Sequence, residues 1–481
     1  MSGAALLARD SRRGRGALAA VTLGSGVAIL DGSVVNVALK TIGADLGAGL
    51  SALQWVVNGY LLALASLVLV GGALSDRWGR RRVYLVGMAW FLVGSVLCAV
   101  AQTPGQLVAM RVLQGVGAAL LTPGALAIIE ASFRPQDRAP AIGTWAGLSG
   151  VAAAIGPFVG GWLVDHGGWR WIFAINVPLC LAVIALSLWA VPESRGRVAG
   201  RFDIAGALLT VLALAALTFA LTAAAEVPPG VLVAELGVAV AASGGFVVVE
   251  RRSPSPLVPL GIFRSRVFSA ANGMTLLVYG ALGAVTFFLV LQLQVSAGWS
   301  ALAAGVSSLP ITVALMLLSS RAAALAARIG PRVPMTVGPL GCAVGVLLLL
   351  GVGPGSGWGA VLPGMVVFAL GLALLVSPLT AAVLAAAPNH LAGVASGVNN
   401  AVARAGSLLA VAALPPLVGM TGTDYLDPGV MTSAYRGAMV LCAVLLTLGG
   451  VVSWVGLEGR APRDPLDGDG APAAGAVRRV G

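Results

Sequence analysis

The sequence predicts an all-α polytopic membrane protein, whose chain crosses the bilayer as a series of helices. Of its 481 residues, 58% are hydrophobic and only 10% are charged, and the mean hydropathy of +0.96 lies far above the range of soluble domains. Apolar runs of about twenty residues recur along the chain, which is the length that spans a ~30 Å hydrocarbon core as a helix. Because lipid offers no hydrogen-bond partner to an open backbone, these runs are expected to be helices.

The predicted helices follow one another along nearly the whole chain, and each is defined by one of fourteen apolar runs. The seventh and eighth runs are the least clearly divided, because only the short segment 226–229 separates them. A single re-entrant element in their place would leave twelve spans. The runs cover residues 17–39, 52–74, 83–101, 107–130, 140–164, 171–191, 204–225, 230–250, 268–291, 301–320, 333–353, 359–384, 394–418 and 434–456.

The loops between the predicted helices place both chain ends on one side of the membrane. Loops on the side of the N-terminal arm and C-terminal tail carry 24 Lys and Arg residues, and loops on the other side carry 3. Because basic loops stay in the cytoplasm, this bias predicts a cell-membrane protein with cytoplasmic termini and with anionic lipid near its basic loops. The net charge of +11 does not indicate nucleic-acid binding, since the basic residues form no single stripe.

Two loops share a pattern that indicates an internal repeat. Arg77 and Gly79 follow the second predicted helix, and Arg328 and Gly330 follow the tenth with the same spacing. Two six-helix halves joined by a two-helix insert would explain this similarity. We expect a cytoplasmic arm over 1–16, an N-terminal six-helix bundle over 17–191, a two-helix insert with cytoplasmic flanks over 192–267, a C-terminal six-helix bundle over 268–456 and a disordered cytoplasmic tail over 457–481.

Asp31 lies near the middle of the first predicted helix. An acid at that depth costs roughly 2.5 to 3.5 kcal/mol on insertion scales, so it is expected to face a cavity or another helix instead of lipid. Intramembrane acids most often lie on substrate or proton pathways, although this one could simply hydrogen-bond a neighbouring helix. The other acids within the apolar runs fall near helix ends, so Asp31 is the main candidate for a functional carboxylate.

Arg111 and Gln114 lie three residues apart on the fourth predicted helix, so they share one face of it. The helix limits place Arg111 within a few ångströms of the depth of Asp31, a distance that an arginine side chain could bridge. Two intramembrane ions of opposite sign usually pair, so we expect Asp31 and Arg111 to interact. The alternative is that Arg111 extends to the outer surface.

Further polar residues within or beside the predicted helices are candidates for the wall of a central cavity. In the first half these are Asn36, Asn58 and Gln114. In the second half, residues that could line the cavity or lie at the membrane interface are Gln292, Gln294, Asn399, Asn400 and Arg404.

Two other segments combine glycine with charge or with proline. Asp76 lies among four arginines after the second predicted helix, which suggests an ion-pair network at a helix end, and Gly79 suggests a tight turn. In the fifth predicted helix, Gly156 precedes Pro157, which removes a backbone donor and kinks the helix. Many membrane helices carry such a kink without a special function, so the pair is informative only together with other motifs.

The sequence carries no enzyme, metal or cofactor motif. The four cysteines fall in apolar runs without metal-ligand spacing, and the two histidines, His166 and His390, are expected in loops. The nucleophile-elbow, Walker and zinc-protease motifs are absent, and the single lysine, Lys40, cannot serve a phosphate loop. We therefore expect a protein that is not an enzyme and that has no catalytic residues, metal or cofactor.

Taken together, these segments resemble the major facilitator superfamily, and within it the drug:proton antiporters with fourteen spans. The resemblance covers nearly the whole chain, although Lys40 stands where the family usually has proline. Family members often carry a further acid in the second half, and none lies deep within the last six predicted helices here. The matching segments are Leu30–Leu39, Gly72–Arg82, Arg111–Gly117, Gly156–Gly161, Trp169–Phe173 and Ala392–Asn400.

The resemblance implies that two halves open a central cavity alternately to each side and export a lipophilic drug or antibiotic in exchange for protons. It assigns proton coupling to Asp31 and Arg111, since a desolvated acid holds its proton more readily and a nearby arginine favours the ionised form. We expect a monomer whose partners are a small lipophilic substrate, protons and membrane lipids, with no nucleic acid. Conformational switching is assigned to Asp76, Arg77, Gly79, Arg80, Gly156 and Pro157.

Three other functions are less consistent with the sequence. A proton-coupled uptake permease for a small metabolite could use the same fold, but the fourteen spans and the Gly156–Pro157 pair favour export by analogy. A channel would need a continuous polar pore, and the helices carry too few polar residues to line one. A membrane-embedded enzyme would need a nucleophile–base or metal set.

The scarcity of acids favours a neutral or weakly charged lipophile as substrate.

Overall fold

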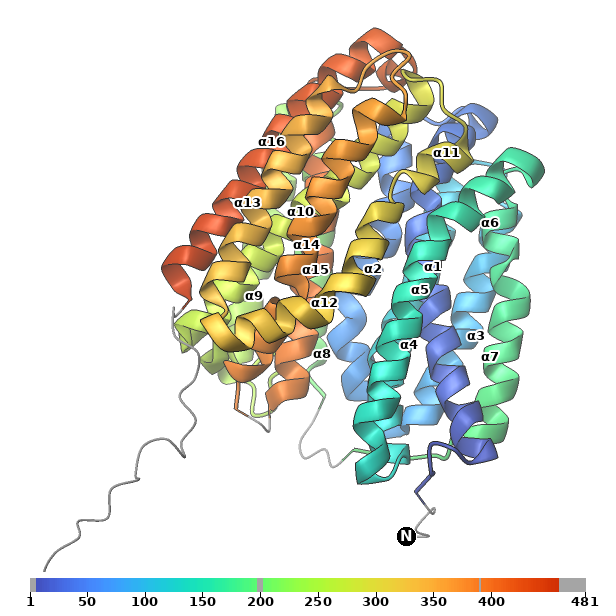
Figure 1. Ribbon diagram of the computed structural model, residues 1–481, viewed down its shortest axis with the longest axis vertical. Coiled ribbons are helices and arrows are strands. Elements are labelled where there is room, and N and C mark those ends of the chain that lie inside the picture. The colour runs from blue at the N-terminus through green and yellow to red at the C-terminus, as the bar shows by residue number, and fades with distance from the viewer. Residues whose placement is uncertain (1–5, 197–201, 389–390, 458–481) are drawn as a thin grey trace, which may run out of the picture.

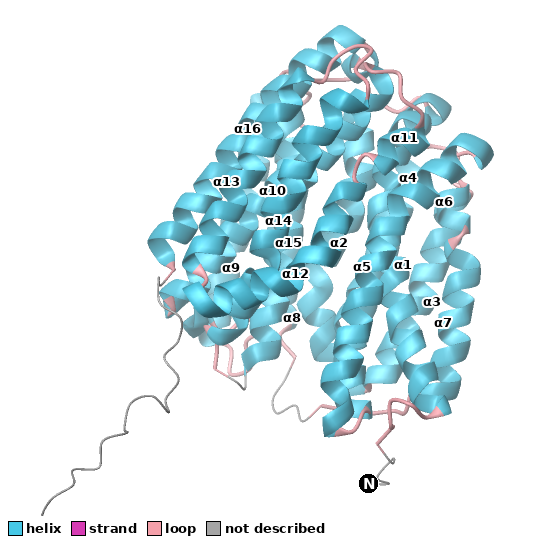
Figure 2. Cartoon of the chain, in the orientation of Figure 1, coloured by secondary structure: helices cyan, strands magenta, loops and turns pink. Residues whose placement is uncertain are grey.

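The computed structural model describes residues 6–196, 202–388 and 391–457, and within these ranges the chain folds into helices joined by short loops, without a β-strand (Figure 2). The disordered tail expected over 457–481 lies almost entirely outside the described residues. Helix α1 begins at Arg12, inside the arm expected over 1–16, because the Oγ of Ser11 accepts a hydrogen bond from Gly14 N at 2.9 Å and caps its first turn.

Within the described ranges, fourteen helical spans are long and apolar enough to cross a membrane, and each coincides with one of the fourteen predicted runs. Short 3-10 helices cover Leu260–Arg264 (η1), Leu349–Gly351 (η2) and Asp424–Leu426 (η4). The spans are α1 (Arg12–Leu46), α2 (Leu50–Trp78), α3 (Arg80–Ala99), α4 (Pro104–Ser132), α5 (Pro135–Gly167), α6 with α7 (Trp171–Ala174 and Asn176–Ala190), α8 (Ile204–Thr222), α9 (Pro229–Arg252), α10 (Arg266–Val295), α11 with α12 (Ala301–Val306 and Leu309–Ile329), α13 (Arg332–Leu348), α14 (Trp358–Ala385), α15 (Ala392–Leu417) and α16 (Pro428–Gly456).

The first six and the last six spans pack in the same pattern. In the first half, α1 packs on α5 and α7, α4 packs on α2 and α3, and α3 packs on α7. In the second half, α10 packs on α15 and α16, α14 packs on α12 and α13, and α13 packs on α16. Counting spans from the start of each half, the same five pairs occur in both, which is the arrangement expected of an internal repeat.

The two halves lie side by side, with the first half in blue to green and the second in yellow to red in Figure 1. They meet where α2 packs on α15 and where α5 packs on α11 and α12. The two helices between the halves are separate elements, joined by a turn over residues 223–228, so the two-helix division of this segment is confirmed. Helix α8 packs on α2 and α15, whereas α9 packs mainly on α8 and is the least buried span.

Candidate functional site

A cavity of about 1290 Å³ lies between the two halves. Its deep wall includes Gly32 and Asn36 from α1, Tyr60 from α2, and Tyr279 and Arg404 from α10 and α15. Towards the face of the bundle where α1 begins, here named the N-terminal face, it is lined by helix-end and loop residues such as Asp76, Arg80, Pro254 and Ala392. The cavity therefore extends from the middle of the bundle to its N-terminal face.

At the opposite face, the two halves are joined by hydrogen bonds. The ammonium of Lys40 donates to Gln294 O at 2.7 Å, and the amide of Gln294 donates back to Val37 O at 2.9 Å. Asp165, in the last turn of α5, accepts from the backbone N–H groups of Ala301 and Leu302 at 3.0 and 2.9 Å. These contacts close the cavity on this side.

Beside the cavity, Asp31 and Arg111 form an ion pair within the first half. Arg111 Nη1 lies 2.6 Å from Asp31 Oδ2, and the two side chains are 1% and 0% exposed. The same Nη1 donates to Gln114 Oε1 at 2.5 Å, and Gln114 Nε2 donates to Asp31 Oδ1 at 2.8 Å. Arg111 therefore lies inside the bundle and does not extend to the outer surface, because Asp31 and Gln114 together satisfy its charge.

Two further polar side chains complete this buried network. Asn176, at the start of α7, donates to Asp31 Oδ1 at 3.0 Å, and Ser95 of α3 accepts from Gln114 Nε2 at 2.8 Å. Neither residue was among the candidates from the sequence, because both contacts join segments far apart in the chain. The signal available was that each is a polar residue inside an apolar run.

The ring of Tyr60 lies between this network and the cavity. Its centroid is 4.4 Å from Arg111 Cζ, a cation–π distance, and Tyr60 itself lines the cavity. The Tyr60 hydroxyl donates to Ala28 O at 3.1 Å, which fixes the ring in this position. Water in the cavity therefore reaches Asp31 only if the Tyr60 ring or a neighbouring helix moves.

Of the eight polar residues considered for the cavity wall, Asn36, Asn400 and Arg404 line this cavity. Gln114 is held by Asp31 and Arg111, as described above. Gln292 points into the second half, where its amide donates to Thr432 Oγ1 at 3.0 Å and to Val352 O at 3.3 Å. Asn58 is fully buried in α2, and neither of its amide atoms has a hydrogen-bond partner among the described residues. In this conformation, packing within each half keeps these three side chains off the wall.

Helix α5 joins α1 on one side and the second half on the other. A Cβ added to Gly160 would lie 2.8 Å from Val34 Cβ, so this glycine lets α5 approach α1 closely, as Gly156 does one turn earlier. A Cβ on Gly161 would lie 2.5 Å from Leu302 Cα in α11. Pro157, one turn earlier on the same side, lines the cavity. The Gly156–Gly161 segment thus lies at the contact between the two halves.

The loop between α2 and α3 forms an ion-pair network at the N-terminal face. Arg80 donates to Asp76 Oδ1 through Nε at 3.0 Å and Nη2 at 2.9 Å, and its Nη1 donates to Ala127 O. Gly79 turns the chain with a φ of 113°, and Gly330 does so at the matching place in the second half with a φ of 85°. A side chain would be strained at either glycine.

Two residues near this loop take part in its contacts. Arg77 lies with its Cζ 6.0 Å from the centroid of the Phe202 ring, at the mouth of the cavity. Glu193, after α7, accepts from the backbone N–H groups of Arg81 and Arg82 at 3.1 and 3.2 Å and so caps the start of α3. The sequence did not mark Glu193, because nothing in its own segment indicates that it reaches a helix start more than a hundred residues earlier.

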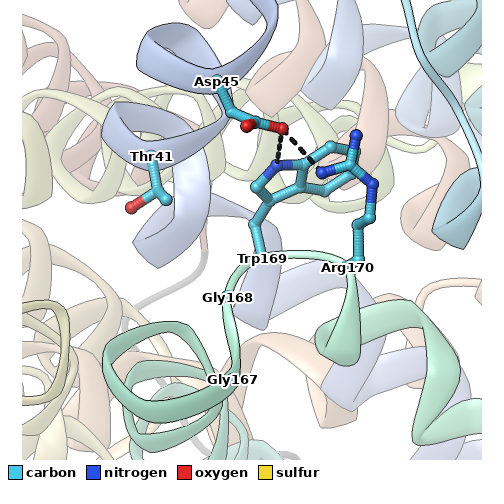
Figure 3. Close-up of a pocket in the computed structure, with 6 residues that line it drawn as sticks. All are labelled: Thr41, Asp45, Gly167, Gly168, Trp169 and Arg170. Carbon is cyan, nitrogen blue, oxygen red and sulfur yellow. Dashed lines mark hydrogen bonds and ion pairs between the residues drawn. The ribbon is translucent and has the colours of Figure 1, made fainter.

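At the opposite face, the Trp169–Arg170 segment binds Asp45 at the end of α1. Asp45 Oδ2 accepts from Trp169 Nε1 at 2.9 Å and from Arg170 Nη1 at 2.6 Å, as Figure 3 shows. Trp169 is only 2% exposed, so it is a buried packing residue. His166 differs from expectation, since it lies in the last turn of α5 and not in a loop.

The described residues contain two repeated six-span bundles with two further spans between them, a central cavity closed at one end and a buried acid–arginine pair beside it. These features define a multi-pass membrane protein with the architecture of a secondary transporter. The chain belongs to the Major Facilitator Superfamily, whose family model matches residues 21–411.

Similar proteins of known name match most of the chain. The tetracenomycin C resistance and export protein of Streptomyces glaucescens is 36% identical over 423 residues, covering 87% of this chain and 78% of that protein. The methylenomycin A resistance protein of Bacillus subtilis (strain 168) is 34% identical over 443 residues, covering 91% and 95%. A crystal structure of the peptide transporter POT in complex with sulfate shares the fold, with a TM-score of 0.69 and 15% identity over 94% of this chain and 98% of that one.

Proposed function

We propose that this protein is a proton-coupled secondary transporter that exports lipophilic drugs or antibiotics by alternating access. The observation that carries the proposal is its similarity, over most of both chains, to resistance and export proteins for tetracenomycin C and methylenomycin A. Apolar side chains such as Ile29, Leu61 and Leu282 form much of the cavity wall, as a lipophilic substrate requires. Similarity to resistance and export proteins favours export over uptake of a small metabolite.

In this proposal, Asp31 carries the coupled proton and Arg111 tunes it. The carboxylate pairs with Arg111 when the cavity is open to the N-terminal face. Opening to the other side would loosen the pair and let the acid take up a proton. Exchange requires such a change of protonation between the two states, and no histidine lies near the cavity among the described residues.

The two bundles, 17–191 and 268–456, would rotate about the cavity during transport, with the insert 192–267 beside them. The switching role falls to Asp76, Arg77, Gly79 and Arg80 at the N-terminal face and to Gly156 and Pro157 at the contact between halves. Of the cavity candidates, Asn36 would contact substrate in the present state. Gln114, Asn58 and Gln292 would become available only if their helices shift.

The excess of basic residues on the loops of the N-terminal face supports cytoplasmic termini in the plasma membrane. With that orientation, the cavity is open to the cytoplasm, so a compound could enter from the cell interior or from the inner leaflet. The protein would act as a monomer in contact with membrane lipids, without a cofactor, because one chain contains the whole cavity.

Export from proteoliposomes under an imposed pH gradient tests the proposal, with tetracenomycin C and methylenomycin A as probes. The wild-type protein should concentrate at least one probe against its gradient. Asp31→Asn keeps the shape of the side chain but cannot titrate, so it should abolish uphill transport while the protein still inserts and folds. Asp31→Glu should retain part of the activity, and Asp10→Asn, which removes an exposed acid, should retain all of it. Uphill transport by Asp31→Asn would show that another group carries the proton.

A further inference from the structure

Arg404 lies at the middle of α15 and faces the central cavity. It is twelve residues after the start of that helix, which places it about 18 Å from the N-terminal face at 1.5 Å per residue. An arginine at this depth normally pairs with an acid or with backbone carbonyls. Its surroundings therefore indicate what it binds.

Arg404 has no ion pair and no hydrogen bond with any other described residue. The acids that line the cavity, Asp76, Glu130 and Asp203, all lie at helix ends near the N-terminal face, and Asp76 is already bound by Arg80. Asp31 is engaged by Arg111 behind the Tyr60 ring and is not exposed to the cavity. The deep part of the cavity therefore contains a cation without a protein anion opposite it.

The groups around Arg404 could contact the uncharged part of a lipophilic acid. Tyr60 and Tyr279 line the cavity with it, and Asn400 and Ser407 of the same helix offer polar groups on the wall. Leu282, from α10, provides an apolar surface beside them. A planar guanidinium binds a carboxylate through two parallel N–H donors, a geometry that a neutral substrate cannot use.

We propose that Arg404 binds the anionic group of the substrate and that the exported compounds are lipophilic acids, with a carboxylate or phenolate next to an apolar body. This inference rests on the proposed export function and names its substrate class. In this arrangement the second half recognises the anion and the first half holds the proton site. Each half therefore contributes one charged group to the exchange.

A pair of probes that differ only in charge tests the proposal: 1-pyrenebutyrate and its methyl ester. Binding to the full chain in nanodiscs of zwitterionic lipid is followed by energy transfer from tryptophan, since Trp145 lines the cavity. The wild-type protein should bind the acid about tenfold or more tightly than the ester, because charge-assisted hydrogen bonds are roughly twice as strong as neutral ones. Equal affinity for the two probes would overturn the proposal.

Variants assign the preference to one side chain. Arg404→Gln should bind acid and ester equally, with ester binding unchanged as the sign that the fold is intact. Arg404→Lys keeps the charge but not the fork, so it should keep part of the preference even if the Gln variant fails to fold. Arg264→Gln, at an exposed arginine of η1, is the matched control and should behave as wild type. A preference that survives in Arg404→Gln or is unaltered in Arg404→Lys would contradict the assignment.

The binding measurement needs no gradient, so it separates this inference from the proposed function. Asp31→Asn should retain the acid preference even though it is expected to lose uphill export. Acid binding through Arg404 in a protein that exports neither probe would support the binding site and contradict the export function. Export of both probes at equal apparent affinity would support export and contradict the role of Arg404.

Discussion

Arg111 Nη1 and Asp31 Oδ2 lie 2.6 Å apart in a buried site. If one of the two side chains is removed, the charge of the other has no water to stabilise it. Arg111 Nε also donates to Val56 O at 3.1 Å, so the guanidinium is fixed against α2 as well as against α1. In a buried pair, loss of one partner costs more than loss of both, because a single uncompensated charge remains.

Arg111→Ala should therefore destabilise the protein by about 3 to 5 kcal/mol, the range for a broken buried pair. The double variant Asp31→Asn with Arg111→Ala should be more stable than Arg111→Ala alone, because it leaves no uncompensated charge in the buried site. Thermal unfolding in detergent measures both effects.

The control for this experiment is Arg264→Ala, which removes an exposed arginine and should change stability little. A double variant that is less stable than both single variants would mean that the two side chains act independently. In that case, the ion pair would be a packing contact without the energetic coupling argued above.

The positions of the helices could be predicted because each apolar run had to form its own backbone hydrogen bonds. Their ends could not, since helices continue past the apolar segment wherever local sequence permits. The tenth run ends at residue 320, but α12 continues to Ile329 because the following residues are mostly alanine, the strongest helix former. Likewise, α1 continues past Lys40 to Leu46.

The partners of Asp31 could be predicted only in part. Arg111 was expected because opposite charges at similar depth attract each other, an argument that needs no knowledge of side-chain packing. Asn176 and Ser95 could not be assigned, because their contacts depend on how α7 and α3 pack around α1 and α4. The place of Arg404 was left open for the same reason: residue type cannot tell a cavity wall from an interface.

The closed opposite face should depend on Asp165. Its carboxylate accepts from two backbone N–H groups at the start of α11 and so joins the two halves. Asp165→Ala removes both hydrogen bonds, and a hydrogen bond to a charged group contributes about 1.5 to 3 kcal/mol. The fraction of molecules whose cavity is open at that face should therefore rise. Spin labels at the exposed residues Gln102 and Leu426, in a background without the buried cysteines, report this as longer distances.

The neighbouring residue provides the matched control for this change. His166 is exposed, and its ring forms a hydrogen bond with Trp162 O and stacks on the Trp162 ring, both within α5. His166→Ala should leave the label distances unchanged. An unchanged distance distribution in Asp165→Ala would show that other bonds between the halves, such as those from Lys40, Gln294 and Gln54, are sufficient to hold the face closed.

The orientation of the chain is open to a direct test with reporter fusions. Fusions after Glu193 and after Arg266 should report the cytoplasm, and a fusion after Pro229 should report the exterior, because α8 and α9 each span the membrane in the proposed arrangement. Alkaline phosphatase and green fluorescent protein give complementary signals at these sites. A cytoplasmic signal at Pro229 would contradict the proposed fourteen-span topology.

Asp76 should control the rate of switching between states without contributing to substrate binding. Its bonds with Arg80, and the bond from Gly196 N to Asp76 O at 2.9 Å, join the end of α2 to the start of α3 and to the chain after α7. These contacts lie far from the deep cavity wall. Closing the cavity at the N-terminal face requires the second half to approach this network, where charge can favour one state over the other.

Asp76→Asn should therefore slow export of every substrate to a similar degree, by about tenfold, which corresponds to about 1.4 kcal/mol and is close to the lower end of the range for a hydrogen bond to a charged group. Equilibrium binding should stay within about twofold of wild type, since substrate bound in the deep cavity does not contact Asp76. Asp10→Asn, which removes an exposed acid from the same face, serves as the control. Export rates in proteoliposomes and binding in nanodiscs separate the two effects, and a loss of binding confined to one substrate would place Asp76 in the substrate path instead.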